Sequence, residues 1–123
     1  MQSLDYRALA KKILGKFDWG IPQVELYRII DEAYGEQWSK PHDAKRWYST
    51  DTTPIRHIAG NLYSLHLGYG PTWAFKNAAL EFLPRLLDAI VEKLIQQTGK
   101  DKVLHVLGAS SGDTINAAHH GVK

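Results

Sequence analysis

The sequence predicts an α/β protein in which a helical N-terminal region is followed by a short β-hairpin and a strand-helix-strand-helix unit. Apolar residues recur at three- and four-residue steps up to Tyr34, which is the period of amphipathic helices. Two short apolar runs then flank a Gly-Asn turn, after which helical and extended patterns alternate. We predict a helical region at 1–53 and a partial α/β region at 54–123, packed as one compact unit.

Composition and charge exclude several classes of protein. Apolar residues make up 44% and charged residues 23% of the 123 residues, values that are typical of soluble globular domains. The net charge of +2 comes without a run of Lys or Arg, and no segment has the roughly 18 consecutive apolar residues of a membrane span. We therefore expect neither nucleic acid nor a membrane as partner, and a cytoplasmic location. The absence of cysteine excludes disulfides and thiolate nucleophiles.

Two helices are expected in the first region. The apolar face of the first is formed by Tyr6, Leu9, Ile13, Leu14 and Phe17. Ser3 is its expected N-cap, and the helix should end between Gly15 and Gly20. Pro22 opens the second helix, because a proline at an early helical position loses no hydrogen bond, and Gly35 ends it. The apolar face of the second helix is expected at Val24, Tyr27, Ile30 and Tyr34.

A polar loop with one short helical turn at 43–47 should follow, its aromatic side chains covering the helices. The runs 55–58 and 62–67 are separated by Ala59, Gly60 and Asn61, which predicts a hairpin. A long helix is expected at 78–97, in which Pro84 either starts the regular helix or kinks it, and Gly99 ends that helix.

The apolar run 102–107 has the character of a buried strand, and another helix begins at 110–114 and continues to the C-terminus. A strand at this place would have an unpaired edge, through which the chain could associate with itself. We therefore expect self-association.

Two segments carry residues suited to chemistry. Lys76 lies at a loop-to-helix junction beside Trp73 and Phe75, and a lysine that forms an imine must lose its proton in such an apolar setting. The alternative is a solvated lysine that opens a helix. The second segment, 108–114, lies between a predicted strand and a helix, where backbone N–H groups and the helix dipole can bind a carboxylate or phosphate. Its alternative is ordinary capping by Ser110 or Ser111.

Together the two segments resemble threonine synthases. The family couples a Gly-Pro-Thr-x-Ala-Phe-Lys-Asp segment to a Ser-Gly-Asp-Thr-Gly turn, and here Gly-Pro-Thr-Trp-Ala-Phe-Lys-Asn at 70–77 precedes Ser-Gly-Asp-Thr at 111–114 in the same order. The resemblance implies an incomplete domain of a fold-type II enzyme that depends on pyridoxal 5'-phosphate (PLP). The complete enzyme converts O-phospho-L-homoserine and water to L-threonine and phosphate.

The resemblance also implies a role for individual residues. Lys76 would be the Schiff-base lysine and proton shuttle, and Phe75 would lie beside the cofactor. The substrate carboxylate and the region of the cofactor's ring hydroxyl would be held by Ser111, Gly112, Asp113 and Thr114. Two positions depart from the family pattern, namely Asn77 in place of Asp and Ile115 in place of Gly. A β-branched residue at position 115 is expected to crowd a ligand that approaches the backbone.

Family members are several times longer, and the glycine-rich cradle for the cofactor's phosphate lies beyond the matching part. We therefore expect an N-terminal piece of a threonine synthase that releases no phosphate from O-phospho-L-homoserine by itself. The alternative from another class is a non-catalytic interaction module in which aromatic side chains bind a protein partner. No histidine pair has the spacing of a metal site, so we expect no metal.

Overall fold

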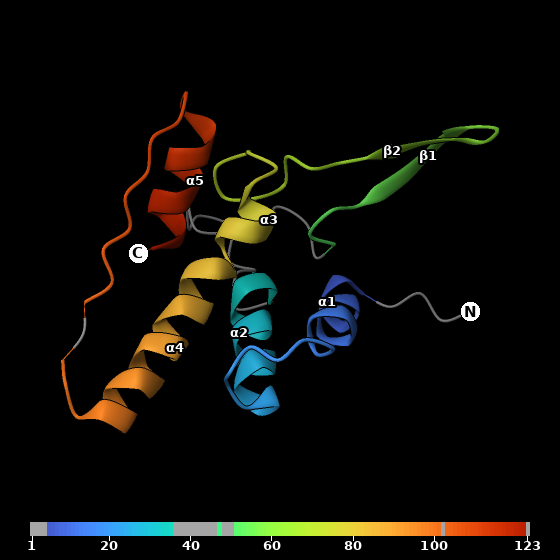
Figure 1. Cartoon of the computed structure of the whole chain (residues 1–123). Helices are drawn as coiled ribbons and strands as arrows, with labels where there is room; N and C mark the ends of the chain where they lie inside the picture. The colour runs from blue at the N-terminus through green and yellow to red at the C-terminus, as the bar shows by residue number, and fades with distance from the viewer. Residues whose placement is uncertain (1–4, 36–46, 48–50, 102, 123) are drawn as a thin grey trace.

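The computed structural model describes residues 5–35, 47, 51–101 and 103–122 and contains helices and a two-stranded sheet (Figure 1). The elements in chain order are α1 (Tyr6–Leu14), α2 (Gln23–Tyr34), β1 (Ile55–Ala59), β2 (Leu62–Leu65), α3 (Asn77–Leu80), α4 (Leu83–Thr98) and α5 (Asp113–Gly121). The predicted α/β class is confirmed at this level. Within the described ranges no helix is both long and apolar enough to cross a bilayer.

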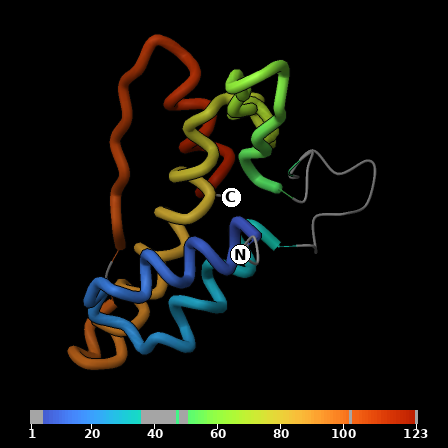
Figure 2. Tube along the Cα trace, turned by 90° about the vertical axis from the view of Figure 1, so that its right-hand side faces the viewer, coloured from blue at the N-terminus to red at the C-terminus, as the bar shows by residue number. Residues whose placement is uncertain are grey.

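The first two helices begin and end close to the predicted places. Asp5 caps α1, because its carboxylate accepts a hydrogen bond of 2.7 Å from the Ala8 amide, whereas the expected cap Ser3 lies outside the described residues. Pro22 is the N-cap of α2, and Gly35 follows its last residue as predicted. An ion pair of 2.6 Å between Lys11 and Asp31 joins the two helices, which lie side by side in Figure 2.

The core forms where α2 meets α4. Its buried members are Leu26, Ile29, Ile30, Ala33, Tyr34, Phe82 and Leu86. The predicted apolar face of α2 is therefore partly wrong: Ile30 and Tyr34 are buried, but Val24 is 77% exposed. Six residues of an α-helix turn through about 240° net, so Val24 and Ile30 cannot share one face.

Trp47 covers the end of α2, as expected for an aromatic residue of the loop that follows this helix. Its Nε1 donates to the Ala33 carbonyl at 2.9 Å, and its ring centroid lies 5.9 Å from that of Tyr34. The other residues of the predicted helical turn at 43–47 lie outside the described residues.

The predicted hairpin is confirmed. Strands β1 and β2 pair antiparallel with Ile55 opposite Leu65 and His57 opposite Tyr63, although β2 ends two residues earlier than the predicted run 62–67. Figure 1 shows the hairpin extending away from the helices, and Tyr63 and Leu65 are accordingly exposed.

Of the two alternatives for Pro84, the first is confirmed: Pro84 starts the regular helix and does not kink it. The segment expected to be one helix is divided into α3 and α4, with Pro84 in the first turn of α4. A proline nitrogen cannot pair with the carbonyl four residues earlier, here that of Leu80. Gly99 ends α4 in a left-handed conformation with φ of 62°, as predicted.

The strand predicted at 102–107 is wrong for the residues that the structure describes. Residues 103–107 have no strand pairing and are exposed, with Leu107 at 96%. An apolar run becomes a strand only when a neighbouring strand supplies hydrogen bonds, and the sheet of the described residues is the hairpin alone. Self-association stays a prediction, now based on exposed apolar side chains rather than on a strand edge.

Tyr34 makes the stability of the fold depend on pH. It is buried, its hydroxyl donates to the Ala78 carbonyl of α3, and burial, reinforced by Tyr6 and Glu81, raises its pKa. The folded-state pKa thus exceeds the unfolded value of about 10, so this contribution to stability is present below pH 10 and is lost as the pH rises above it. We expect Tyr34→Phe to lower the free energy of unfolding by about 1 kcal/mol at pH 8.

The difference between wild type and Tyr34→Phe should then shrink between pH 8 and pH 11. Urea unfolding at both pH values measures it. An equal difference at the two pH values would contradict the role of the buried hydroxyl.

Candidate active site

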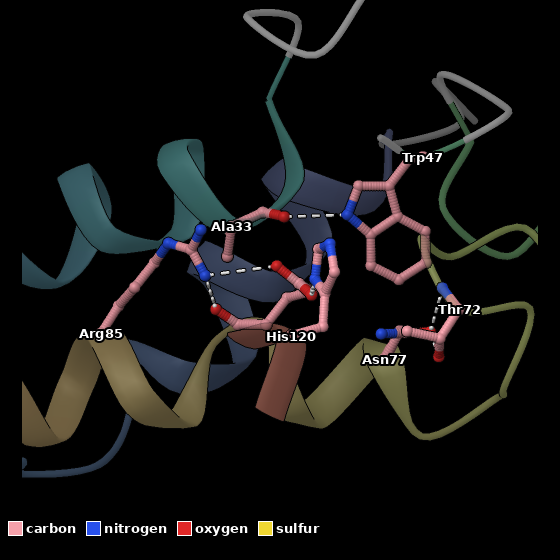
Figure 3. A network of polar contacts seen from close by, with 7 residues as sticks. Ala33, Trp47, Thr72, Asn77, Arg85 and His120 are labelled. Carbon is pink, nitrogen blue, oxygen red and sulfur yellow. Dashed lines mark hydrogen bonds and ion pairs between the residues drawn. The ribbon is translucent and has the colours of Figure 1, made fainter. Parts of the chain in front are cut away.

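The lysine loop, residues 70–77, is closed by one buried side chain. Asn77 is fully buried, and its Oδ1 accepts hydrogen bonds from the Thr72 amide at 3.1 Å and the Thr72 hydroxyl at 2.7 Å (Figure 3). The Trp73 amide donates to the Gly70 carbonyl at 3.0 Å, and Trp73 has a φ of 60°, which is rare for a residue other than glycine. The loop is therefore a tight, strained turn held from within.

Gly70 is required by the same packing. A Cβ atom built on Gly70 would lie 2.5 Å from the Cβ of Asn77, which is too close for any side chain. The departure from Asp to Asn at position 77 leaves this closure intact, because both side chains offer Oδ1 as an acceptor. The Nδ2 of Asn77 is buried and has no hydrogen-bond partner among the described residues.

Lys76 lies directly before α3 and is half-buried. Its Nζ is 4.3 Å from the centroid of the Phe75 ring, within the range of a cation–π contact. The expected aromatic setting is thus provided by Phe75, which is itself 59% exposed, whereas Trp73 points largely to solvent. Lys76 and Phe75 form an open site with one aromatic wall.

The second segment is a helix start with free donors. The N-cap of α5 is Gly112, so neither Ser110 nor Ser111 is the N-cap residue, although Ser110 Oγ accepts from the amides of Gly112 at 3.2 Å and Ile115 at 3.0 Å. Gly112 has φ of 142°, a conformation that favours glycine. Of the first amides of α5, those of Asp113 and Thr114 remain for an acceptor outside the described residues. Residues 111–114 are exposed.

The two segments belong to neighbouring helices. Helix α3, which follows Lys76 directly, packs against α5, which begins at the 111–114 turn. Within the described part of the chain, no hydrogen bond joins Lys76 to that turn. Lys76 and the turn are therefore linked indirectly, because each of them adjoins one of two helices that pack against each other.

Ile115 lies against the backbone that precedes α5. Its Cδ1 would lie 2.4 Å from a Cβ built on Gly108, so the side chain covers the Gly108 backbone. It also lines an open groove of about 490 Å³ together with Val106 and His119. The backbone before α5 is accordingly less accessible than it would be with glycine at position 115.

Sequence reasoning missed three groups near the site: Thr72, which closes the lysine loop, and the buried carboxylate Glu81 with its partner His120. One signal was present, because Asn77, Glu81 and Arg85 follow at four-residue steps and so lie on one side of successive helical turns. Polar residues repeated along one face of a predicted helix indicated that a polar cluster could be buried there. Among the described residues no group of three acidic or histidine side chains could hold a metal ion.

Gly70→Ala should destabilise the fold, because the buried Asn77 cannot move away without losing both bonds to Thr72. We expect the free energy of unfolding to fall by about 1–3 kcal/mol, the usual cost of overpacking. Gly68→Ala is the matched control, since its Cβ would meet the Trp73 carbonyl at an ordinary 3.4 Å. Urea unfolding of both variants measures the difference, and equal values would show that the loop is not closed as described.

Comparison with known proteins identifies close relatives. The chain is 34% identical to the threonine synthase of Eremothecium gossypii and 36% identical to that of Pseudomonas aeruginosa, in each case over 98% of its own length. It spans 23% and 22% of the length of these relatives. A protein named threonine synthase-like 1 in Mus musculus is 33% identical over 82% of the chain.

No family model matches the chain. The relatives nevertheless share one name across fungi and bacteria, and their similarity extends over both the helical region and the two segments described above. The match to 70–77 and 111–114 therefore lies within a similarity of nearly the whole chain. The chain belongs to the threonine synthase family, of whose curated members it spans about a quarter of the length or less.

Proposed function

We propose that this chain supplies the lysine and the carboxylate-binding turn of a fold-type II, PLP-dependent threonine synthase, as its N-terminal part. The complete enzyme would convert O-phospho-L-homoserine and water to L-threonine and phosphate. The observation that carries the proposal is the packing of α3 on α5, which relates Lys76 to the 111–114 turn in a chain similar to threonine synthases.

The residues present fit the cofactor. Lys76 Nζ lies against an aromatic ring, and in the described part of the chain no carboxylate pairs with it, so the amine is accessible to an aldehyde. The exposed amides of Asp113 and Thr114 and the positive end of the α5 dipole suit an anion. PLP would supply an electron sink for carbanions of the substrate.

The chain's own residues would then orient the reactants. Lys76 would hold the cofactor and, once neutral, carry protons to and from the substrate carbon atoms through Nζ. Phe75 would lie beside the cofactor ring, and Asp113 near its ring hydroxyl. The substrate carboxylate would be bound by Ser111, Gly112 and Thr114, where Gly112 lets the backbone approach closely.

The proposal assigns only part of an active site to residues 1–123. It covers the lysine and the carboxylate turn, and the cofactor's phosphate would bind elsewhere in the enzyme. The division into regions 1–53 and 54–123 stays a prediction. The alternative of a non-catalytic interaction module is not favoured, because the relatives are threonine synthases by name over most of the chain.

Titration with PLP tests the proposal. A new absorbance band should appear on mixing, and reduction with borohydride followed by peptide mapping should find the label at Lys76. The reason is that the Phe75 ring holds Nζ of Lys76 in one place, and no carboxylate of the described residues pairs with this amine, so an aldehyde can reach it. Label distributed over the lysines at random would instead indicate a module without a cofactor site.

A further inference from the structure

A buried carboxylate lies at the junction of α3 and α4. Glu81 is 1% exposed, and its Oε1 is 2.8 Å from Nδ1 of His120, while its Oε2 is 3.3 Å from Nη1 of Arg85. Arg85 also donates to the Glu81 carbonyl. Figure 3 shows His120 and Arg85 approaching this group from α5 and α4. Because a buried charge is costly unless it is paired, both partners stabilise the carboxylate.

The two partners differ in what they connect. Arg85 is four residues from Glu81, so its contact is local, whereas His120 is 39 residues away and belongs to α5. An ionised carboxylate only accepts hydrogen bonds, and Nδ1 of His120 is therefore the donor. The other ring nitrogen, Nε2, is buried and has no partner among the described residues. Among the described residues, the imidazole of His120 therefore makes its hydrogen bond to Glu81 alone.

A close backbone approach lies next to this contact. A Cβ on Gly121 would be 2.0 Å from the Leu80 carbonyl, the same carbonyl that Pro84 cannot pair with inside the helix. Ala117 is fully buried, whereas residues 111–116 are exposed. Helix α5 is therefore fixed by its C-terminal half, and its first turn projects freely.

We propose that the Glu81–His120 pair is a positioning pair that sets the place of the 111–114 turn relative to Lys76. Helix α3 begins directly after Lys76, and α5 begins at the turn, so the direction of α5 on α3 decides the distance between them. The inference rests on the proposed function, because it is the lysine and the carboxylate turn of that site that the pair would hold in register.

A distance measurement tests the pair without any cofactor. The chain has no cysteine, so Ala79→Cys and Asn116→Cys place spin labels on exposed positions of α3 and α5. We expect a narrow distance distribution in this background and loss of the narrow distribution with His120→Ala. His119→Ala is the matched control, since His119 is the exposed neighbour on the same helix and should leave the distribution unchanged.

Glu81 variants separate the hydrogen bond from mere packing. Glu81→Gln keeps an acceptor oxygen for His120 and should retain the narrow distribution, whereas Glu81→Leu should lose it. Circular dichroism confirms that each variant is folded, and the His120→Ala and Glu81→Gln results suffice if the leucine variant is not. An unchanged distribution in folded His120→Ala would overturn the proposal.

The PLP-loaded chain provides a second readout. His120→Ala should still be labelled at Lys76, because the lysine loop is closed by Thr72 and Asn77. The concentration of O-phospho-L-homoserine that half-saturates the change in cofactor absorbance should rise roughly ten- to hundredfold, as expected when one hydrogen bond to a charged group is lost. An equal half-saturation in the variant would count against the pair.

The two hypotheses can fail separately. If the wild-type chain carries no label at Lys76, the proposed function is wrong, and the spin-label distances still decide whether Glu81 and His120 fix α5 on α3. If Lys76 is labelled and the distances do not respond to His120→Ala, only the positioning pair is wrong.

Discussion

Lys76→Arg is expected to abolish specific labelling of the chain by PLP and borohydride. The guanidinium stays protonated in proteins and forms no stable imine with an aldehyde, yet it keeps the positive charge over the Phe75 ring. The fold should therefore remain while the chemistry is lost. Mass spectrometry of the reduced protein should show roughly one label per wild-type chain and at least a tenfold lower stoichiometry in the variant.

Lys100→Arg is the control for this result. Lys100 is an exposed lysine that follows the end of α4, and its replacement removes one amine without touching the lysine loop. We expect this variant to be labelled like the wild type. If instead Lys76→Arg and Lys100→Arg lose equal small fractions of label, PLP reacts with surface amines only, and Lys76 is an ordinary lysine at the start of a helix.

The sequence is enough to propose Lys76 and the 111–114 turn as site residues, from residue type, order and spacing, and this assignment stays a prediction. The contacts that hold the two segments in place could not be predicted. The closure of the lysine loop depends on the φ of Trp73 and on the approach of Gly70 to Asn77, which no local pattern specifies. The contact between Glu81 and His120 joins residues 39 positions apart and is likewise absent from any local pattern.

Helix ends and the missing strand illustrate the same distinction. Gly35 and Gly99 were assigned correctly, and Pro84 was recognised as an interruption, because proline and glycine act on their own backbone, whatever surrounds them. Only the structure decided that Pro84 starts α4. The strand at 102–107 was assigned from apolar residues alone. Since a strand needs hydrogen bonds from another segment, the exposed run at 103–107 shows that apolar character does not make a strand by itself.

Ile30→Ala is expected to cause the largest loss of stability. Ile30 of α2 is fully buried, and it belongs to the core that also contains Phe82 and Leu86. Truncation of a buried isoleucine to alanine costs about 2–5 kcal/mol, because it removes apolar burial and leaves a cavity. That is a large part of the roughly 5–15 kcal/mol by which domains are stable, so urea unfolding at neutral pH should show a much lower midpoint.

Val24→Ala on the same helix tests whether α2 buries the face seen in the structure or the face expected from the sequence. The apolar pattern placed Val24 and Ile30 on one face, but Val24 is 77% exposed, and truncation there should change the free energy of unfolding by less than about 0.5 kcal/mol. Both variants make the same kind of change, from a β-branched residue to alanine, so helix propensity contributes similarly to each. Equal losses would mean that α2 is rotated from the orientation described, and that Tyr34 and Trp47 do not cover its end in this way.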